Sequence, residues 1–142
     1  MKFKVFLYNL KLIINIKFIK LILSSSKESS IINYFIDQKY YIKNKNEIYF
    51  SIRNNGGSTL SRGKNFFNRE IKTLSWIESF EKQSIFIDVG SNIGLFSLYA
   101  AYNKNSVISI EPEALNFAQL NLNIYDNKFN DKIKAYSIAL NN

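Results

Sequence analysis

The sequence predicts an α/β fold built on a parallel sheet of about three strands with flanking helices. From residue 68 onward, short apolar runs rich in β-branched residues alternate with segments of helical periodicity. This alternation is typical of parallel strands joined by right-handed helical crossovers. The 142 residues suit one small domain, and a hydrophobic content of 46% with a single proline indicates a packed chain.

Residues 1–30 are expected to form a basic, apolar leader followed by a polar linker. The leader, Met1–Leu23, is apolar but is interrupted by Lys11, Lys17 and Lys20. A membrane-spanning helix needs about 20 mostly apolar residues, and a signal peptide needs an unbroken apolar centre. We therefore expect a helix or extension that lies against the protein, in preference to an interfacial membrane helix formed by residues 1–23. The lack of an export signal favours a cytoplasmic location.

The composition excludes several classes of function. The chain has no histidine and no cysteine, so it has neither a Ser-His-Asp triad nor histidine or thiolate ligands for zinc, and no metal site is expected. The net charge of +8 does not predict a nucleic-acid partner, because six of the 19 basic residues and none of the 11 acidic ones lie within residues 1–27. The remainder is close to neutral and carries no known nucleic-acid motif.

Residues 31–60 are expected to form a small extension made of a helix and a hairpin. Residues 31–36 are apolar, and residues 40–42 and 48–52 read as two strands joined by a turn at 43–46. Paired Asn and Gly residues at 54–58 tolerate the positive φ of a turn, and they close this unit. Residues 61–142 then form the main unit.

The main unit supplies the alternating elements. Apolar residues spaced by three predict a helix over 68–80, followed by a strand at 85–89 and a buried helix at 93–102. A strand at 107–110, a third helix after Pro112 and a strand at 133–140 complete the series. The third helix has one apolar face, made of Leu115, Ala118, Leu122 and Tyr125. Three aromatic residues at helical spacing are interpreted as core: Trp76, Tyr99 and Phe117.

The glycine-containing turn after the strand at 85–89 is the first candidate for a ligand site. Backbone N–H groups at the start of the next helix face the crevice beyond the strand ends, where nucleotide-like ligands bind. Gly90 leaves room for a ligand, and Gly94 allows the helix to pack closely. The G-x-x-x-G spacing lacks the middle glycine of a dinucleotide loop. Asp88 suits a cationic ligand, such as the ammonium group of S-adenosylmethionine.

A second acidic residue, Glu111, ends the next strand. A carboxylate at this place accepts hydrogen bonds from both ribose hydroxyls of an adenosine. Two other interpretations stay open: Asp88 as a cap of the following helix, and Asn92 as either a cap or a ligand contact. Three further polar residues are interpreted as ordinary surface residues: Arg62, Glu70 and Thr73.

These stretches resemble the FkbM-type methyltransferases. The similarity lies in D-V-G-S-N-I-G-L-F-S-L-Y-A-A at 88–101, S-I-E-P at 109–112 and N-L-N at 121–123, with a looser match at Arg62 and at 70–77; together it spans residues 48–142. The resemblance implies a Rossmann-like class I methyltransferase fold and S-adenosylmethionine as methyl donor. It also implies an acceptor hydroxyl on a sugar, glycan or polyketide-like molecule. It assigns no catalytic residue and implies donor contacts from Asp88, Gly90, Asn92, Gly94 and Glu111.

The resemblance also implies a larger sheet than this sequence supplies. Residues 61–142 are expected to form the N-terminal, donor-binding half of the domain, present as a fragment without the half that binds the acceptor. The strand at 85–89 then becomes an open sheet edge that favours association with another chain. Two alternatives stay open: a catalytically inactive nucleotide-binding module and, less favoured, a fragment of a dinucleotide-dependent oxidoreductase.

Overall fold

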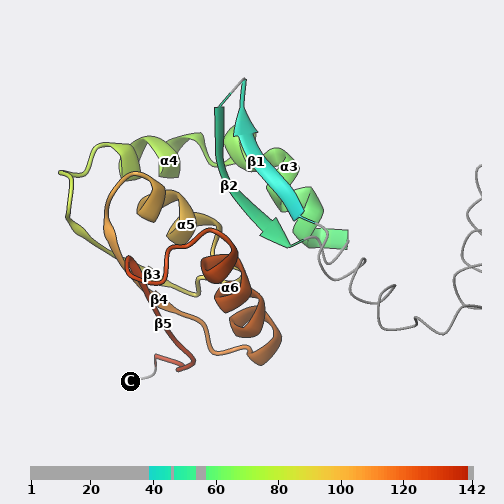
Figure 1. Ribbon diagram of the computed structural model, residues 1–142, viewed down its shortest axis with the longest axis vertical. Coiled ribbons are helices and arrows are strands. Elements are labelled where there is room, and N and C mark those ends of the chain that lie inside the picture. Colours follow the sequence, from blue (N-terminus) through green and yellow to red (C-terminus); the bar gives the residue numbers. More distant parts are fainter. Residues whose placement is uncertain (1–38, 46, 54–56, 141–142) are drawn as a thin grey trace, which may run out of the picture. The chain divides into compact units, whose positions relative to one another are not determined.

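The computed structural model describes residues 39–45, 47–53 and 57–140, all within one compact unit that begins at Gln38. The expected leader, the polar linker and the apolar stretch 31–36 lie outside the described residues, as do positions 54–56 of the expected turn. A hairpin comes first along the chain, followed by two helices and then by strands that alternate with helices (Figure 1).

The described strands form one hairpin and one parallel sheet. Strands β1 (Lys39–Asn44) and β2 (Glu47–Arg53) pair antiparallel, as the sequence predicted. Strands β3 (Ile85–Val89), β4 (Ser106–Ile110) and β5 (Ile133–Tyr136) pair in parallel in the order β3-β4-β5, which confirms the predicted fold class. Strand β5 is shorter than predicted, because Tyr136 pairs with the last residue of β4 and no strand residue remains to pair beyond it.

Three of the four described helices confirm predicted ones: α4 (Ile71–Glu78), α5 (Leu95–Tyr102) and α6 (Ala114–Asp126). Helix α5 begins at Leu95 and not at residue 93, because Gly94 has a φ of 90° that a right-handed helix does not accept. It is almost wholly buried, as predicted, and its Tyr99 is core.

Helix α3 (Gly57–Arg69) was not predicted, and the turn expected at residues 57–58 is its first turn. The helix packs against the hairpin through Gly63. A Cβ at that position would lie 3.0 Å from Cδ1 of Ile52, so the close approach depends on glycine. The helix also spans the boundary that was expected between residues 60 and 61.

The apolar face predicted for α6 (Ala114–Asp126) is not the face that packs against the core. The face that carries Leu115 and Tyr125 is exposed, with 80% and 69% of these side chains accessible. The buried face holds Leu120 and Ile124, which join the core, together with two buried amides, Gln119 and Asn123. Amide side chains can be buried there because they hydrogen-bond to buried backbone groups.

Those amides attach α6 to strand β2. The backbone N–H of Ser51 donates to Asn127 Oδ1 at 2.8 Å, and that of Arg53 donates to Asn123 Oδ1 at 2.9 Å. The Arg53 guanidinium also pairs with the carboxylate of Asp126, with Nε 2.9 Å from Oδ2. Side chains of α6 and of the residue after it therefore accept the hydrogen bonds of backbone N–H groups on β2 that a further strand would otherwise accept.

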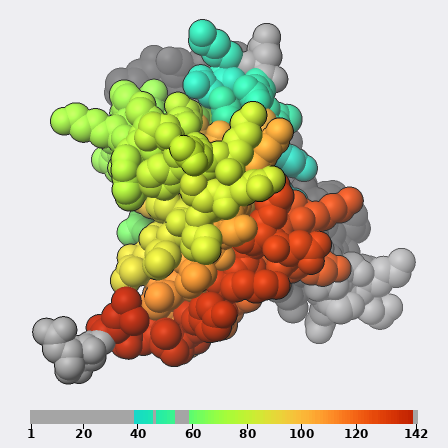
Figure 2. Space-filling view, turned by 90° about the vertical axis from the view of Figure 1, so that its left-hand side faces the viewer, coloured from blue at the N-terminus to red at the C-terminus, as the bar shows by residue number. Residues whose placement is uncertain are grey.

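One face of the parallel sheet is bare in the described part of the chain. Helices cover the face that carries Phe86 and Asp88, whereas Ile85, Ile87 and Val89 on the other face of β3 are exposed. Figure 2 looks toward this side, where atoms of the strand region, yellow through red, lie at the surface. Trp76, expected in the core, is also 57% exposed and packs its ring edge-on against Phe80.

Candidate functional site

The site is built at the carboxyl end of β3, where the chain turns through the glycine loop, residues 90–94. Gly90, Asn92 and Gly94 have positive φ values of 75°, 53° and 90°. The backbone N–H groups of Gly90 and Ser91 both donate to the carbonyl oxygen of Ile110, at 2.8 and 3.0 Å. These bonds fix the loop against the end of β4, so the two strand ends form one unit.

The two glycines of the loop serve different purposes. A Cβ on Gly90 would meet no atom within 4 Å, so this backbone faces open space that a ligand can enter. A Cβ on Gly94 would lie 2.4 Å from Cδ1 of the fully buried Leu120. Gly94 therefore allows the loop to pack closely on α6, whereas the sequence predicted that it lets α5 pack closely on its own strand.

Glu111 directly follows β4 and holds the glycine loop from the second strand end. Its Oε2 accepts a 2.7 Å hydrogen bond from the backbone N–H of Asn92, and its Oε1 accepts one of 3.0 Å from the N–H of Glu113. A longer contact of 3.5 Å comes from Asn116 Nδ2. An ionised carboxylate offers about four acceptor positions, so the side chain keeps acceptor capacity for a ligand hydroxyl. It is only 5% exposed.

Asp88 lies beneath the loop and supports the start of α5. Its Oδ2 accepts a 2.5 Å hydrogen bond from the hydroxyl of Ser97. The hydroxyl oxygens of Ser97 and Ser109 are 2.6 Å apart, and since the Ser97 proton goes to Asp88, the Ser109 hydroxyl donates to Ser97. Burial raises the pKa of Asp88, hydrogen bonds from the hydroxyl and backbone of Ser97 lower it in part, and the nearby charge of Glu111 raises it further.

The sequence left open whether Asp88 caps the following helix, and the observed position of Asp88 agrees with that interpretation. Helix α5 has no capping side chain at Gly94, and a buried carboxylate that bonds to Ser97, in the first turn, stabilises the helix start from beneath. The parallel register pairs Val89 with Ile110, so Asp88, near the end of β3, and Glu111, directly after β4, stand at the same edge of the sheet. A direct contact between Asp88 and the donor stays a prediction.

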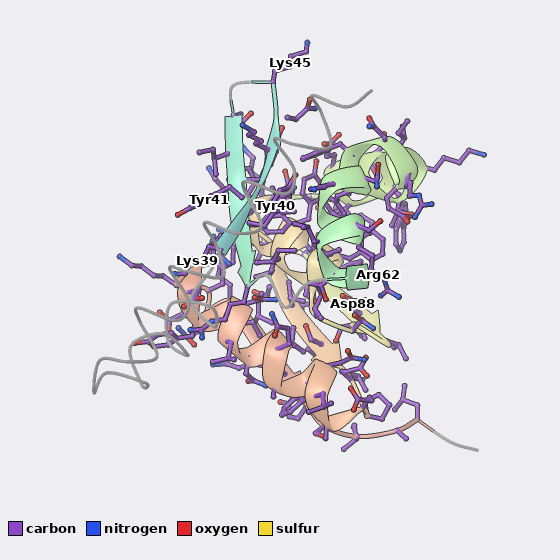
Figure 3. The ribbon with its side chains drawn as sticks, turned by 90° about the vertical axis from the view of Figure 1, so that its right-hand side faces the viewer. Lys39, Tyr40, Tyr41, Lys45, Arg62 and Asp88 are labelled. Carbon is purple, nitrogen blue, oxygen red and sulfur yellow. The ribbon has the colours of Figure 1, made fainter. Side chains whose placement is uncertain are left out.

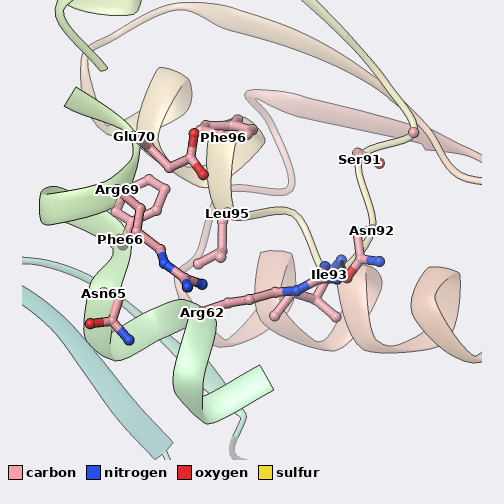
Figure 4. A pocket seen from close by; sticks show the side chains of 11 residues that line it. Arg62, Asn65, Phe66, Arg69, Glu70, Ser91, Asn92, Ile93, Leu95 and Phe96 are labelled. Carbon is pink, nitrogen blue, oxygen red and sulfur yellow. Dashed lines mark hydrogen bonds between the residues drawn. The ribbon is translucent and has the colours of Figure 1, made fainter. Parts of the chain in front are cut away.

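A pocket of about 270 Å³ lies in front of the glycine loop (Figure 4). Gly90 and Asn92 line it, whereas Asp88, Gly94 and Glu111 do not. Asn92 does not cap α5; its Oδ1 accepts a hydrogen bond from the next N–H, that of Ile93, at 2.9 Å. The structure thus brings the predicted residues to one edge of the sheet. Gly90 and Asn92 face the pocket, whereas Asp88, Gly94 and Glu111 support the loop from behind.

The opposite wall of the pocket was missed by sequence reasoning. It comes from the end of α3 and the residue after it: Arg62, Asn65, Phe66, Arg69 and Glu70. The looser resemblance included Arg62 and Glu70, but Glu70 was interpreted as a helix-surface residue and Arg62 as an ordinary surface cation. In Figure 3, Arg62 is seen to project from α3, and Asp88 comes from the neighbouring end of β3.

Asn123 is a second residue that sequence reasoning assigned no role. It is fully buried, and its Nδ2 donates a 2.9 Å hydrogen bond to the carbonyl of Ile93 while its Oδ1 accepts from the N–H of Arg53. One amide therefore ties the glycine loop to β2. Its place in the N-L-N motif was the available signal, but the motif alone does not show what the side chain holds.

The arrangement fits an adenosyl ligand. An open backbone at Gly90 and a carboxylate at the second strand end are features that nucleotide-like ligands use at strand ends. Across residues 39–45, 47–53 and 57–140, no group of three or more acidic side chains is placed to hold a metal ion. Within the same ranges, no helix has the length and apolar character required to cross a membrane.

No family model matches the sequence, and no curated protein is significantly similar to it. Among solved structures, a SAM-dependent methyltransferase from Agrobacterium tumefaciens superposes with a TM-score of 0.51 at 13% identity, over 70% of this chain and 32% of that one. The chain has a methyltransferase fold. It corresponds to part of the class I, Rossmann-like domain, with three parallel strands and their helices.

Two further solved structures are similar to shorter parts of the chain. TYW2 from P. horikoshii, solved in complex with MeSAdo, has a TM-score of 0.43 and 33% identity over 48% of this chain and 26% of its own. The C-terminal domain of precorrin-6Y C5,15-methyltransferase from Rhodobacter capsulatus has a TM-score of 0.45 and 16% identity over 63% and 44%. The chain thus spans between about a quarter and a half of the structures that it matches.

Proposed function

We propose that this chain binds S-adenosylmethionine at the carboxyl ends of β3 and β4 and is the donor-binding part of a methyltransferase of FkbM type. The observation that carries the proposal is the bond between the Glu111 carboxylate and the N–H of Asn92, beside the open backbone of Gly90. This bond sets the acidic residue that accepts ribose hydroxyls directly against the loop that faces the rest of the ligand.

Each predicted residue then has a defined task. Glu111 accepts hydrogen bonds from the ribose hydroxyls, and Gly90 and Asn92 present backbone to the ligand. Gly94 keeps the loop packed on Leu120, and Asp88 stabilises the start of α5 beneath the loop. When bound, the donor supplies an electrophilic methyl group on a sulfonium; the chain's own contribution is to hold it in one orientation. We propose a sugar, glycan or polyketide-like hydroxyl as the acceptor, on the resemblance of residues 88–101 and 109–112 to the FkbM type.

The spacing of the loop separates this proposal from a dinucleotide site. Ser91 and Asn92 stand between Gly90 and Gly94, and Ser91 is buried, where a pyrophosphate loop needs a second glycine for close approach. The buried carboxylate of Asp88 beneath the loop adds negative charge that disfavours a diphosphate.

Calorimetric titration of the full chain with S-adenosylhomocysteine and with NAD tests the proposal. We expect saturable binding of S-adenosylhomocysteine and none of NAD. Glu111→Gln should weaken binding by about 10-fold or more, since it replaces a charged acceptor of hydroxyl hydrogen bonds. Glu81→Gln, which changes an exposed carboxylate on the segment that precedes β3, serves as the matched control and should leave the affinity unchanged. Binding of NAD alone, or equal effects of the two variants, contradicts the proposal.

Methyl transfer is tested with S-adenosylmethionine that carries a radiolabelled methyl group. The acceptors are sugars, glycans or polyketides that carry hydroxyl groups. Labelled acceptor supports the methyltransferase, whereas donor binding without any transfer to these acceptors supports the inactive binding module.

A further inference from the structure

The free edge of strand β3 is a feature of the fold that the proposed function does not use. Strand β3 pairs with β4 on one side, and no strand within residues 39–45, 47–53 and 57–140 pairs with its other side. The strand contains no proline, and its one charged side chain, that of Asp88, is buried on the covered face. Natural sheet edges are commonly protected by charged residues or proline against pairing with another chain. This edge lacks that protection.

The hydrogen bonds between β3 and β4 show which backbone groups reach the free edge. The carbonyl of Ser84 accepts from the N–H of the first residue of β4, and the N–H of Gly90 donates to the carbonyl of the last. Backbone groups of successive strand residues point alternately to the two sides of the strand, so those of Phe86 and Asp88 also face β4. The N–H and C=O groups of the three residues between them therefore point to the free edge, namely Ile85, Ile87 and Val89.

The side chains of the same three residues form an apolar row on the bare face of the sheet. Ile85, Ile87 and Val89 are 67%, 58% and 58% exposed, and they alternate with buried residues. The edge thus offers unpaired backbone groups and uncovered apolar side chains at the same positions. A flat, apolar and unprotected edge of this kind is suited to pairing with a strand of another chain.

The row is symmetric about Ile87, and this symmetry suits a second copy of the same chain. In an antiparallel pair with a two-fold axis at Ile87, this residue faces its own copy, and Ile85 faces Val89 of the second copy. Each residue pair exchanges two N–H···O bonds, because all of these residues carry outward backbone groups. A shift by one residue would set outward groups against groups that already bond to β4, and a shift by two would leave one residue of each strand unpaired. One register is therefore favoured.

We propose that two copies of this chain associate through their β3 strands, which pair antiparallel about Ile87 and join two three-stranded sheets into one. The three side chains and the paired backbone bury on the order of 300–400 Å² per copy, whereas a standard interface buries about 800 Å² per partner. The dimer is therefore weak, with a dissociation constant on the order of 100 μM.

Amide hydrogen exchange of the full chain, followed by NMR at about 50 μM and about 1 mM, measures the pairing directly. The amides of Ile85, Ile87 and Val89 should exchange several-fold more slowly at the higher concentration, because they then donate to the second copy. The amides of Phe86 and Asp88 donate to β4 at both concentrations and serve as internal controls. Exchange of the three edge amides that is equally fast at both concentrations overturns the proposal. Equal protection at both also overturns it, because another part of the same chain then covers the edge.

Charge substitution at the two-fold axis tests the register. Ile87→Glu and Ile87→Lys each set two like charges opposite one another, so each variant alone should dimerise about 10-fold or more weakly than the parent. Mixed in equal amounts, the two variants should associate with each other, because opposite charges then face across the axis. Ile48→Glu changes an isoleucine of equal exposure on β2, and this matched control should dimerise like the parent. Sedimentation velocity measures the association of each sample.

The sedimentation results support or overturn the proposal in defined ways. A parent chain that stays monomeric at about 1 mM overturns it, as do equal losses of association in Ile87→Glu and Ile48→Glu. Dimers of the parent without recovery in the mixture of the two charge variants place the contact elsewhere and overturn it as well. Circular dichroism checks that each variant is folded. If a substitution at Ile87 unfolds the chain, the exchange measurement on the parent decides.

Discussion

The backbone N–H of Asn92 donates a 2.7 Å hydrogen bond to the carboxylate of Glu111, so the residue that ends β4 holds the loop that ends β3. The ligand contact and the support of the loop therefore depend on the same side chain. Glu111→Gln should lower the free energy of unfolding by about 1–3 kcal/mol, because a carboxamide cannot accept from the N–H groups of Asn92 and Glu113 as a charged carboxylate does. Urea unfolding measures this loss. An unchanged unfolding midpoint contradicts the role of Glu111 as a support of the loop.

Asn123→Ala should destabilise the chain by about 2–4 kcal/mol, because it removes a fully buried amide that accepts from the N–H of Arg53 and donates to the carbonyl of Ile93. Asn121→Ala is the matched control, since Asn121 is exposed and bonds only to the carbonyl of Phe117 in its own helix. It should cost less than about 0.5 kcal/mol. Similar losses in the two variants, measured by urea unfolding, would show that the link from the loop to β2 contributes little.

The two glycines of the loop should respond differently to alanine. Gly94→Ala adds a Cβ 2.4 Å from the buried Leu120 in addition to the strain of a positive φ, and we expect a loss of several kcal/mol. Gly90→Ala meets no neighbour, so it should cost only the left-handed strain of about 1–2 kcal/mol, yet weaken donor binding because its Cβ enters the ligand's space. Thermal unfolding and calorimetric titration of both variants check the ranking. A larger loss of stability from Gly90→Ala would contradict it.

The buried carboxylate of Asp88 should make the free energy of unfolding decrease as the pH rises. Burial raises its pKa in the folded chain, so ionisation penalises the fold as the pH rises from about 4, the unfolded value, through the folded value. The difference in unfolding free energy between the parent and Asp88→Asn should therefore fall with rising pH. Urea unfolding at intervals between about pH 3.5 and pH 7 measures this difference.

Asp126→Asn supplies a control of the opposite sign. Burial acts to raise the pKa of Asp126, but the hydrogen bonds and charge of Arg53, with Lys39, outweigh it, and the pKa in the fold is lowered. The stabilisation from this carboxylate is present above about pH 4 and is lost as the pH falls through the folded value. Parent minus Asp126→Asn should thus rise with pH below about pH 4 and level off above it, whereas parent minus Asp88→Asn should fall with pH above about pH 4. Slopes of the same sign would contradict the two environments.

The elements that sequence patterns predict well here are those whose burial depends on apolar residues alone. Strand β3 and helix α5 are nearly continuous apolar runs separated by glycine, so their type and order and the burial of α5 could be predicted. The exposed face of β3, with Ile85, Ile87 and Val89, could not. Helix α3 could not, because glycine, serine and asparagine lower its helix propensity. It forms in the fold because Gly63 and Phe66 pack it against the hairpin and the core, a contact with residues distant in sequence.

The buried face of α6 could not be predicted either, because part of it consists of polar side chains. A hydrophobic pattern selects Leu115 and Tyr125, yet the helix turns Asn123 inward because the edge of β2 and the loop at Ile93 need hydrogen-bond partners. The same reasoning applies to the site. Asp88, Gly90 and Glu111 stand in a recognisable strand-turn-helix pattern. The opposite wall of the pocket, which includes Arg62 and Arg69, belongs to α3, which the pattern did not predict.

The central claim is that an adenosyl ligand binds where β3 and β4 end, and amide chemical shifts test it most directly. Titration of ¹⁵N-labelled full chain with S-adenosylhomocysteine should shift the amide signals of residues 90–94 and 111–113, and leave those of the hairpin turn at Lys43 and Lys45 in place. Saturable shifts confined to residues outside these two strand ends, or no shifts at millimolar ligand, would contradict the account.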